Sequence, residues 1–170
     1  MVAALTFGKK GYTEHDARMD EIGVWAQALK DRLLAAMDED TLAFDRVMAG
    51  FRLPKGTDEE RATRQRAIEE ATKQATLIPL GVLERCPDLL ELALDLERLG
   101  NQNSLSDAGV GGLMARGGAY GAYYNVLINL RGISDAEWCA STRARADAAL
   151  SRVDELASRA ERAVLAKLAG

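Results

Sequence analysis

An acidic residue beside a glycine-rich stretch is the first candidate for chemistry in this sequence. Asp107 lies where the polar segment 100–106 gives way to the apolar stretch 108–130, which contains six glycines. Each glycine inside a helix costs roughly 0.5–1 kcal/mol relative to alanine, which indicates that a helix or a ligand approaches this backbone closely. A carboxylate here can act as an acid, a base or a counter-charge. It can equally form a capping box with Ser104 or interact with the helix dipole.

A second carboxylate, Asp40, interrupts an apolar stripe. It follows Met37 by three residues and precedes Phe44 by four, so we expect it to face the core or a cleft. A buried charge is costly unless it is paired, so Asp40 should meet a ligand or a partner. The alternatives are a salt bridge, for example to Arg116, and a solvated position at the edge of the stripe.

Helical periodicity dominates the elements that must position these carboxylates. Apolar residues recur at three- and four-residue steps over 16–48 and again over 138–168. Capping boxes are expected at Thr57 and at Ser134, each with a glutamate three residues later. These signals predict long helices joined by short turns.

Two prolines fall within the second long helix, which is expected to begin at the Thr57 capping box. Pro79 is expected to kink it, and Pro87 to break it again before the segment 88–99 resumes the apolar pattern. The sequence has no sustained strand-type alternation. It therefore predicts an all-α fold, a bundle of long antiparallel helices with a kinked central helix.

Composition limits the class of protein. With 170 residues, 48% of them hydrophobic, the chain is expected to form a single domain over 1–170. A net charge of −4 with mixed signs argues against a nucleic-acid surface. Cys86 and Cys139 are far apart and there is one histidine, so we expect neither a metal site nor a disulfide, as is typical of the cytoplasm. No segment reads as membrane-spanning.

Six segments, in one order along the whole chain, carry a family resemblance. They are LTFGKKGY (5–12), MDEDTLAFDRVM (37–48), LPKGTDEE (53–60), ATLIPL (75–80), GNQNSLSDAGVGG (100–112) and NVLINL (125–130). In them the chain resembles the formimidoyltetrahydrofolate cyclodeaminase and methenyltetrahydrofolate cyclohydrolase family. The spelling GAYYNVLINL (121–130) is more similar to the cyclodeaminase domain of bifunctional formimidoyltransferase-cyclodeaminases than to the cyclohydrolases.

The resemblance implies a C–N lyase of one-carbon metabolism and histidine degradation. In 5-formimidoyltetrahydrofolate, N10 attacks the amidine carbon and ammonia leaves, giving 5,10-methenyltetrahydrofolate. This needs a base near N10, an acid near the departing amine and a negative charge near the developing cation. Asp107 matches the aspartate of the family's SDAGV motif and is the expected catalytic group. Asp40 is expected to hold the pterin or to tune Asp107.

Six further residues are expected to bind the substrate: Lys9, Lys10, Asn103, Ser106, Asn125 and Asn129. The two lysines would hold the carboxylates of a folate glutamate or polyglutamate tail, or else offset the dipole at a helix end. The amides at 125 and 129, one turn apart, would bond pterin edges or the ends of other helices. The two loop residues would orient Asp107 or the ligand, or cap the helix.

The resemblance also implies which partners the chain has and how much of the family's domain it covers. It implies a homodimer, a tetrahydrofolate derivative as substrate, no tightly bound cofactor, and a formimidoyltransferase as partner or fused domain. Family members begin with a glycine-rich loop and a first helix, whereas Met1 stands near that helix's end, so we expect this chain to lack both. Two other functions stay open. One is methenyltetrahydrofolate cyclohydrolase, which uses an activated water, and the other is a non-catalytic helical interaction or folate-binding module.

Overall fold

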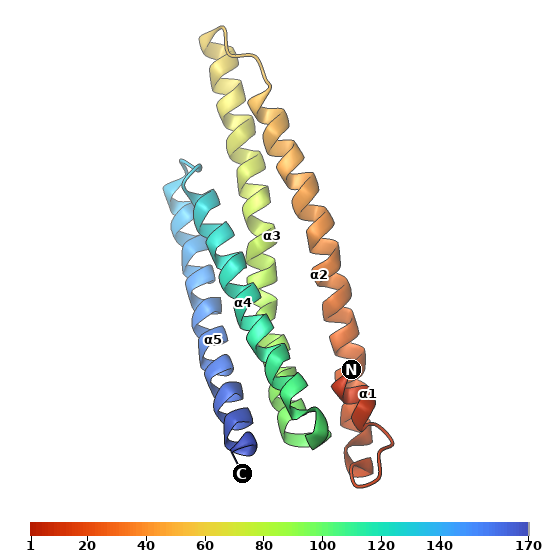
Figure 1. Ribbon diagram of the computed structural model, residues 1–170. Helices are drawn as coiled ribbons and strands as arrows, with labels where there is room; N and C mark the ends of the chain where they lie inside the picture. The colour runs from red at the N-terminus through yellow and green to blue at the C-terminus, as the bar shows by residue number, and fades with distance from the viewer. Residues whose placement is uncertain (170) are drawn as a thin grey trace.

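Four long helices build the molecule, which a computed structural model describes over residues 1–169 (Figure 1). They are α2 (Asp16–Phe51), α3 (Asp58–Leu99), α4 (Leu105–Leu130) and α5 (Ala136–Leu168). A short helix, α1 (Val2–Thr6), and two 3-10 turns, Thr13–His15 and Gln102–Ser104, complete the chain. Residues 1–169 contain no strand, which confirms the predicted all-α bundle of antiparallel helices.

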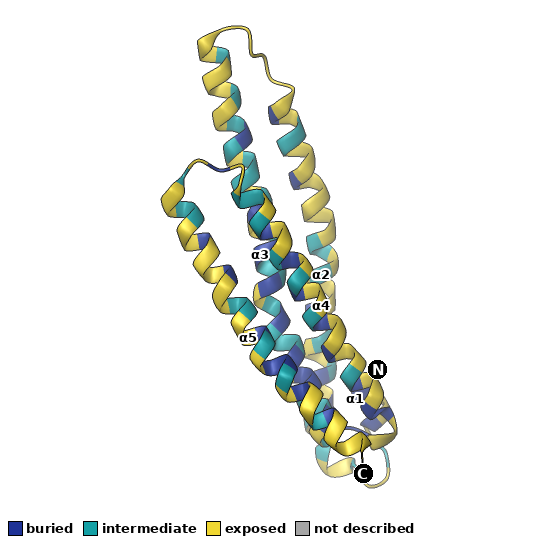
Figure 2. Cartoon of the chain, turned by 60° about the vertical axis from the view of Figure 1, so that its left-hand side comes forward, coloured by how far each residue is buried: buried dark blue, intermediate teal, exposed yellow. Residues whose placement is uncertain are grey.

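The longest helix, α3, is the centre of the bundle and contacts α2, α4 and α5. It runs without interruption through Pro79 and Pro87, so the predicted break at Pro87 is wrong. Leu80, Leu83 and Leu90 on either side of that proline are fully buried in the core. Figure 2 shows buried residues in the part of α3 that the other helices cover. Their packing against α4 and α5 outweighs the roughly 3 kcal/mol that a proline costs inside a helix.

Helix ends follow the sequence where the signal is local. The capping box at the start of α3 is confirmed, because Glu60 N–H donates to Thr57 Oγ1 at 3.1 Å and Thr57 N–H donates to the Glu60 carboxylate at 3.0 Å. At the start of α5 the prediction is wrong. The cap is Asp135, which accepts from Trp138 N–H at 3.0 Å, while the Ser134 hydroxyl donates to Glu69 of α3.

A second core cluster fixes the lower end of the bundle in the view of Figure 1. Ala3 of α1 packs with Met19, Ile22 and Leu29 of α2 and with Leu92 of α3. Within residues 1–169, no helix is long and apolar enough to cross a membrane.

Candidate functional site

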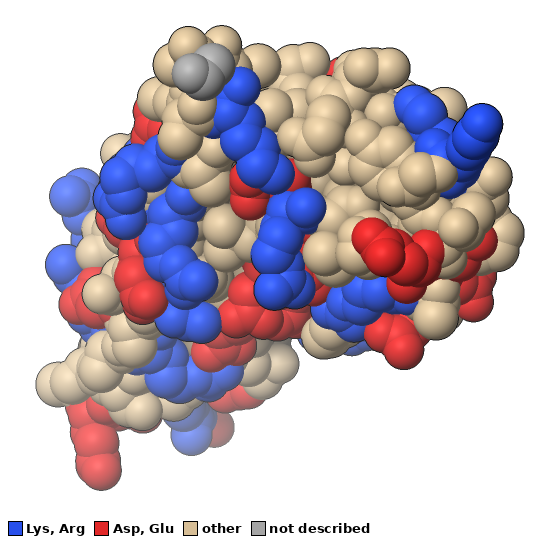
Figure 3. Space-filling model, turned by 90° about the horizontal axis from the view of Figure 1, so that it is seen from below, with Lys and Arg blue, Asp and Glu red and all other residues tan. Residues whose placement is uncertain are grey.

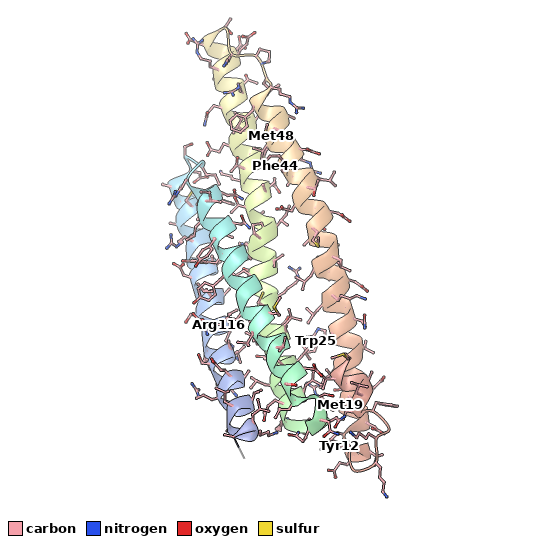
Figure 4. The ribbon with its side chains drawn as sticks, viewed as in Figure 1. Tyr12, Met19, Trp25, Phe44, Met48 and Arg116 are labelled. Carbon is pink, nitrogen blue, oxygen red and sulfur yellow. The ribbon has the colours of Figure 1, made fainter. Side chains whose placement is uncertain are left out.

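The N-terminal segment is tied to the loop that leads into α4. The Thr6 hydroxyl, fully buried, accepts a hydrogen bond from Asn101 N–H at 2.8 Å. The Tyr12 hydroxyl accepts from Gln102 N–H at 3.2 Å, and Figure 4 shows Tyr12 at this lower end. The loop is therefore held by residues about 90 positions earlier in the chain.

The predicted lysines lie in a tight turn at the same end. Gly8 and Gly11 adopt φ of +69° and +88°, a left-handed conformation that strongly favours glycine. Lys9 Nζ lies 5.6 Å from the centroid of the Tyr12 ring, and Lys10 is exposed. Neither lysine forms an ion pair within residues 1–169, and viewed from below this end shows charged groups around a broad uncharged area (Figure 3). Both are free to meet an anion.

Asp107 lies in the first turn of α4 and is exposed. Ser104 occupies the N-cap position without a side-chain cap bond, so the alternative of a capping box is not realised. In the described part of the chain, Asp107 has no hydrogen bond or ion pair through its carboxylate. Its neighbours Asn103 and Ser106 are also exposed. Its side chain is therefore available to a group from outside this helix.

A hollow of ≈ 330 Å³ lies between α2, α3 and α4. Asp40 from α2 and Asn125 from α4 line it, and Pro79 of α3 forms part of its apolar wall. Gly118 and Gly121 of α4 also line the hollow and leave it open there, because an added Cβ at either position would meet no atom within 4 Å. Asp40 thus faces a cleft, as the stripe predicts, and the sequence pattern alone could not have paired it with Asn125.

The proposed salt bridge from Asp40 to Arg116 does not form. Arg116 lies midway along α4 (Figure 4) and instead pairs with Asp154 of α5, at 2.8 Å between Nη2 and Oδ1. Tyr120 also donates to Asp154, at 2.8 Å, and this hydrogen bond raises the pKa of Tyr120. The trio, which the sequence reading missed, pins α4 to α5 and leaves the Asp40 carboxylate unpaired within residues 1–169.

The structure divides the predicted site residues into two groups. Lys9, Lys10, Asn103, Ser106 and Asp107 lie at the lower end, and Asp40, Asn125 and Asn129 lie farther along the bundle. Asp107 and Asn125 are eighteen residues apart on one straight helix, which is about 27 Å at 1.5 Å per residue. One chain therefore does not bring Asp107 to the hollow, and Asp40 cannot tune it within that chain.

No cluster of three or more metal-ligating side chains occurs within the described residues. The arrangement offers carboxylates and amides to an organic ligand. A hollow of this size falls within the range usual for small-molecule sites.

Comparisons with known proteins agree on one family. The pattern of the Formiminotransferase-cyclodeaminase family matches residues 1–148. A methenyltetrahydrofolate cyclohydrolase from Methylorubrum extorquens is 41% identical over 135 residues, which are 79% of this chain and 65% of that protein. The formimidoyltransferase-cyclodeaminase of Rattus norvegicus is 34% identical over 145 residues, 85% of this chain and 27% of that protein.

A solved structure shows the same fold. The formiminotetrahydrofolate cyclodeaminase of Thermotoga maritima superposes with a TM-score of 0.86 at 24% identity, covering 99% of this chain and 80% of that one. The match thus spans less than two thirds of the Methylorubrum relative and about a quarter of the rat relative.

Proposed function

Because this chain belongs to the formiminotransferase-cyclodeaminase family, we propose that it acts on the one-carbon bridge between N5 and N10 of a tetrahydrofolate. The reaction we propose first is cyclodeamination of 5-formimidoyltetrahydrofolate. The bond from N10 to the amidine carbon forms, the bond from that carbon to the amine nitrogen breaks, and the N10 proton is passed on so that ammonia leaves.

The observation that best supports this proposal is the hollow lined by Asp40 and Asn125. Its apolar wall suits the flat face of a pterin, and its glycine edges let a ring approach the backbone closely. The Asn125 amide can donate to and accept from the polar edge of the ring. The Asp40 carboxylate can accept the N10 proton and then offset the positive charge of the methenyl product.

Asp107 keeps its proposed catalytic role only at a site where Asp107 and Asp40 come from different chains. The lysines at 9 and 10 remain candidates for the glutamate tail. A formimidoyltransferase would supply the substrate, as a separate chain or a fused domain.

Methenyltetrahydrofolate cyclohydrolase is the second candidate, favoured by the 41% identical relative of that name. In that reaction a water activated by the same carboxylate would add to the methenyl carbon and open the ring. The two reactions differ in whether the methenyl chromophore is formed or consumed, so near-ultraviolet absorbance with each substrate separates them.

The decisive variant is Asp40→Asn, with Asp38→Asn as its control, because Asp38 is also an exposed acid of α2 but does not line the hollow. We expect Asp40→Asn to lower kcat by roughly 10²–10⁴-fold, the usual loss for a general acid or base, and Asp38→Asn to leave it within about twofold. Equal activity of the two variants would remove Asp40 from the mechanism. If the chain turns over neither substrate but tetrahydrofolate raises its Tm, the folate-binding module is correct instead.

A further inference from the structure

A second cavity, of ≈ 420 Å³, lies between α2 and α3, which run side by side (Figure 1). Three arginines line it, Arg32 and Arg46 from α2 and Arg85 from α3, and we call it the arginine groove. Only Ala36 and Ile78 line both this groove and the hollow at Asp40. The arginine groove therefore opens on the other side of the contact between α2 and α3.

Arg85 is fixed in the arginine groove by its own helix. Its Nη1 donates to the Gly81 carbonyl at 2.5 Å, which folds the side chain back along α3 by one turn. A Cβ added to Gly81 would lie 2.9 Å from this Nη1, so the glycine leaves the room that the guanidinium occupies. A guanidinium has five N–H donors, and this contact uses one of them. Within residues 1–169 Arg85 forms no ion pair, so its other donors are free to hold an anion.

The register of α2 against α3 places this guanidinium between the other two arginines. Gly50 of α2 packs on Ile68 of α3, where an added Cβ would lie 3.1 Å from Ile68 Cγ1. Gly81 comes thirteen residues after Ile68, and position 37 comes thirteen residues before Gly50. Because the helices are antiparallel and rise equally per residue, Gly81 is level with position 37 of α2.

The two arginines of α2 therefore flank the fixed guanidinium of Arg85. Arg32 stands about 8 Å from its level along the helix axis, and Arg46 about 14 Å in the opposite direction. Both are exposed, and neither forms an ion pair within the described residues. Their long, flexible side chains can turn towards an anion bound at Arg85, and Arg32 is the nearer of the two.

The charges that line the arginine groove leave it positive. Two glutamates accompany the three arginines. Glu84 pairs with Arg145 of α5 at 2.9 Å, so its charge is already offset. Glu39 has no partner within residues 1–169 and offsets one arginine. Two positive charges remain, and a phosphate monoester, which carries about −1.5 to −2 at pH 7, would balance them.

Apolar side chains form the wall beside the fixed guanidinium. Ile78 and Leu77 precede Gly81 by three and four residues, and Leu77 is exposed although it is apolar. The planar fork of an arginine matches phosphate oxygens, and the cavity has the volume usual for a small molecule. We therefore propose that the arginine groove binds a small organic phosphate monoester. Arg85 and Arg32 hold its phosphate, and its apolar part lies against Leu77 and Ile78. This site does not depend on the proposed folate reaction.

Phenyl phosphate is the probe, and calorimetric titration of the full chain at low ionic strength is the measurement. We expect Arg85→Gln to raise the dissociation constant by roughly tenfold, because charge-assisted hydrogen bonds to the phosphate are lost. Arg66→Gln is the matched control. Arg66 also donates to a carbonyl one turn earlier on α3, at 3.4 Å, but it does not line the arginine groove. Unchanged affinity in Arg85→Gln, or an equal loss in Arg66→Gln, would overturn the site.

Two variants test the geometry and the charge separately. Gly81→Ala keeps every charge but displaces the guanidinium, so we expect binding to weaken by about three- to tenfold while Tm does not fall, since alanine favours a helix. Glu39→Gln removes the unpaired acid and should tighten binding by about threefold. Wild-type affinity in Gly81→Ala would overturn the anchoring of Arg85, and weaker binding in Glu39→Gln would overturn the charge balance.

Comparison of ligands tests the class of compound. Leu77→Ser should weaken phenyl phosphate by roughly threefold and leave inorganic phosphate unchanged, because only the ester has an apolar part. Benzoate, with one charge, should bind more weakly than phenyl phosphate, and equal affinity would overturn the choice of a phosphate. Saturating tetrahydrofolate should leave the affinity for phenyl phosphate unchanged, because the hollow lies across the contact between α2 and α3. Competition between the two would overturn the separate site and assign the arginine groove to the folate.

Discussion

The link between α1 and the loop before α4 gives a quantitative test through Thr6. Its hydroxyl is fully buried and accepts from Asn101 N–H at 2.8 Å, and it also donates to Val2 C=O at 2.8 Å. Thr6→Val keeps the shape but leaves the Asn101 N–H without its acceptor inside the protein. A buried donor left unsatisfied costs about 1–3 kcal/mol. At about 2–4 °C per kcal/mol for a chain of this size, Tm should fall by roughly 2–12 °C.

Thr76→Val is the matched control. Thr76 is also fully buried, but its hydroxyl donates only to the Thr72 carbonyl of its own helix, at 2.7 Å. Valine there leaves no donor unsatisfied, so the free energy of unfolding should change by less than about 0.5 kcal/mol. Urea unfolding followed by circular dichroism gives both values, and hydrogen exchange of the Asn101 amide reports the local effect. If Thr6→Val matches Thr76→Val in stability and the Asn101 amide exchanges at the wild-type rate, this account of the link is refuted.

Two further changes test packing and ionisation. Gly50→Ala would place a Cβ 3.1 Å from Ile68 Cγ1 and 3.3 Å from the Ile68 backbone, so the free energy of unfolding measured in urea should fall by about 1–3 kcal/mol. Gly23→Ala is the control, because a Cβ there would meet nothing within 4 Å, and it should raise that free energy by about 0.5–1 kcal/mol. Burial raises the pKa of the Cys86 thiol to about 11. In the unfolded chain this thiol has its ordinary pKa of 9.0, so its contribution to stability is present below pH 9 and is lost as the pH rises towards 11. The stability of wild type should therefore fall more steeply over that interval than that of Cys86→Ala; parallel curves would contradict the buried thiol.

Local signals in the sequence predict the helix ends well only where the partners are local. The Thr57 capping box joins residues three apart, and it forms as read. Ser134 has the same spacing to a glutamate, but its hydroxyl is taken by Glu69, 65 residues earlier, and the neighbouring Asp135 caps the helix while pairing with Lys73 of α3 at 2.7 Å. No reading of a short segment could have found that competition.

Pro87 is a second place where the local sequence misleads, here because it does not reveal tertiary packing. Its effect on an isolated helix is large, yet the residues around it are buried against two other helices, which the local pattern does not reveal. Burial of Cys86 and Leu90 on either side needs α3 to stay helical. The long helical stretches and their order along the chain could be predicted, because long periodic stretches outweigh single residues.

For the site, the sequence supplies residue types but not distances. Asp40 reads correctly as an acid facing a cleft, since its stripe is visible in the sequence. That Asn125 lines the same cleft depends on how α2 and α4 lean on α3, which no spacing encodes. The expectation that Asp40 tunes Asp107 assumed that the two carboxylates lie close together in one chain. The length of α4 rules out that closeness.

Small residues lie on both sides of α4, but only those on its covered side have a role in packing within the chain. On its covered side, Ala115, Ala119 and Ala122 are buried and let α3 and α5 approach, so their size is explained within one chain. On its open side, Gly117 and Gly121 touch nothing. Because the covered side packs against α3 and α5, α4 stays helical throughout, and Asp107 and Asn125 stay about 27 Å apart. Within a single chain, Asp107 and the hollow at Asn125 are therefore separate places on one helix.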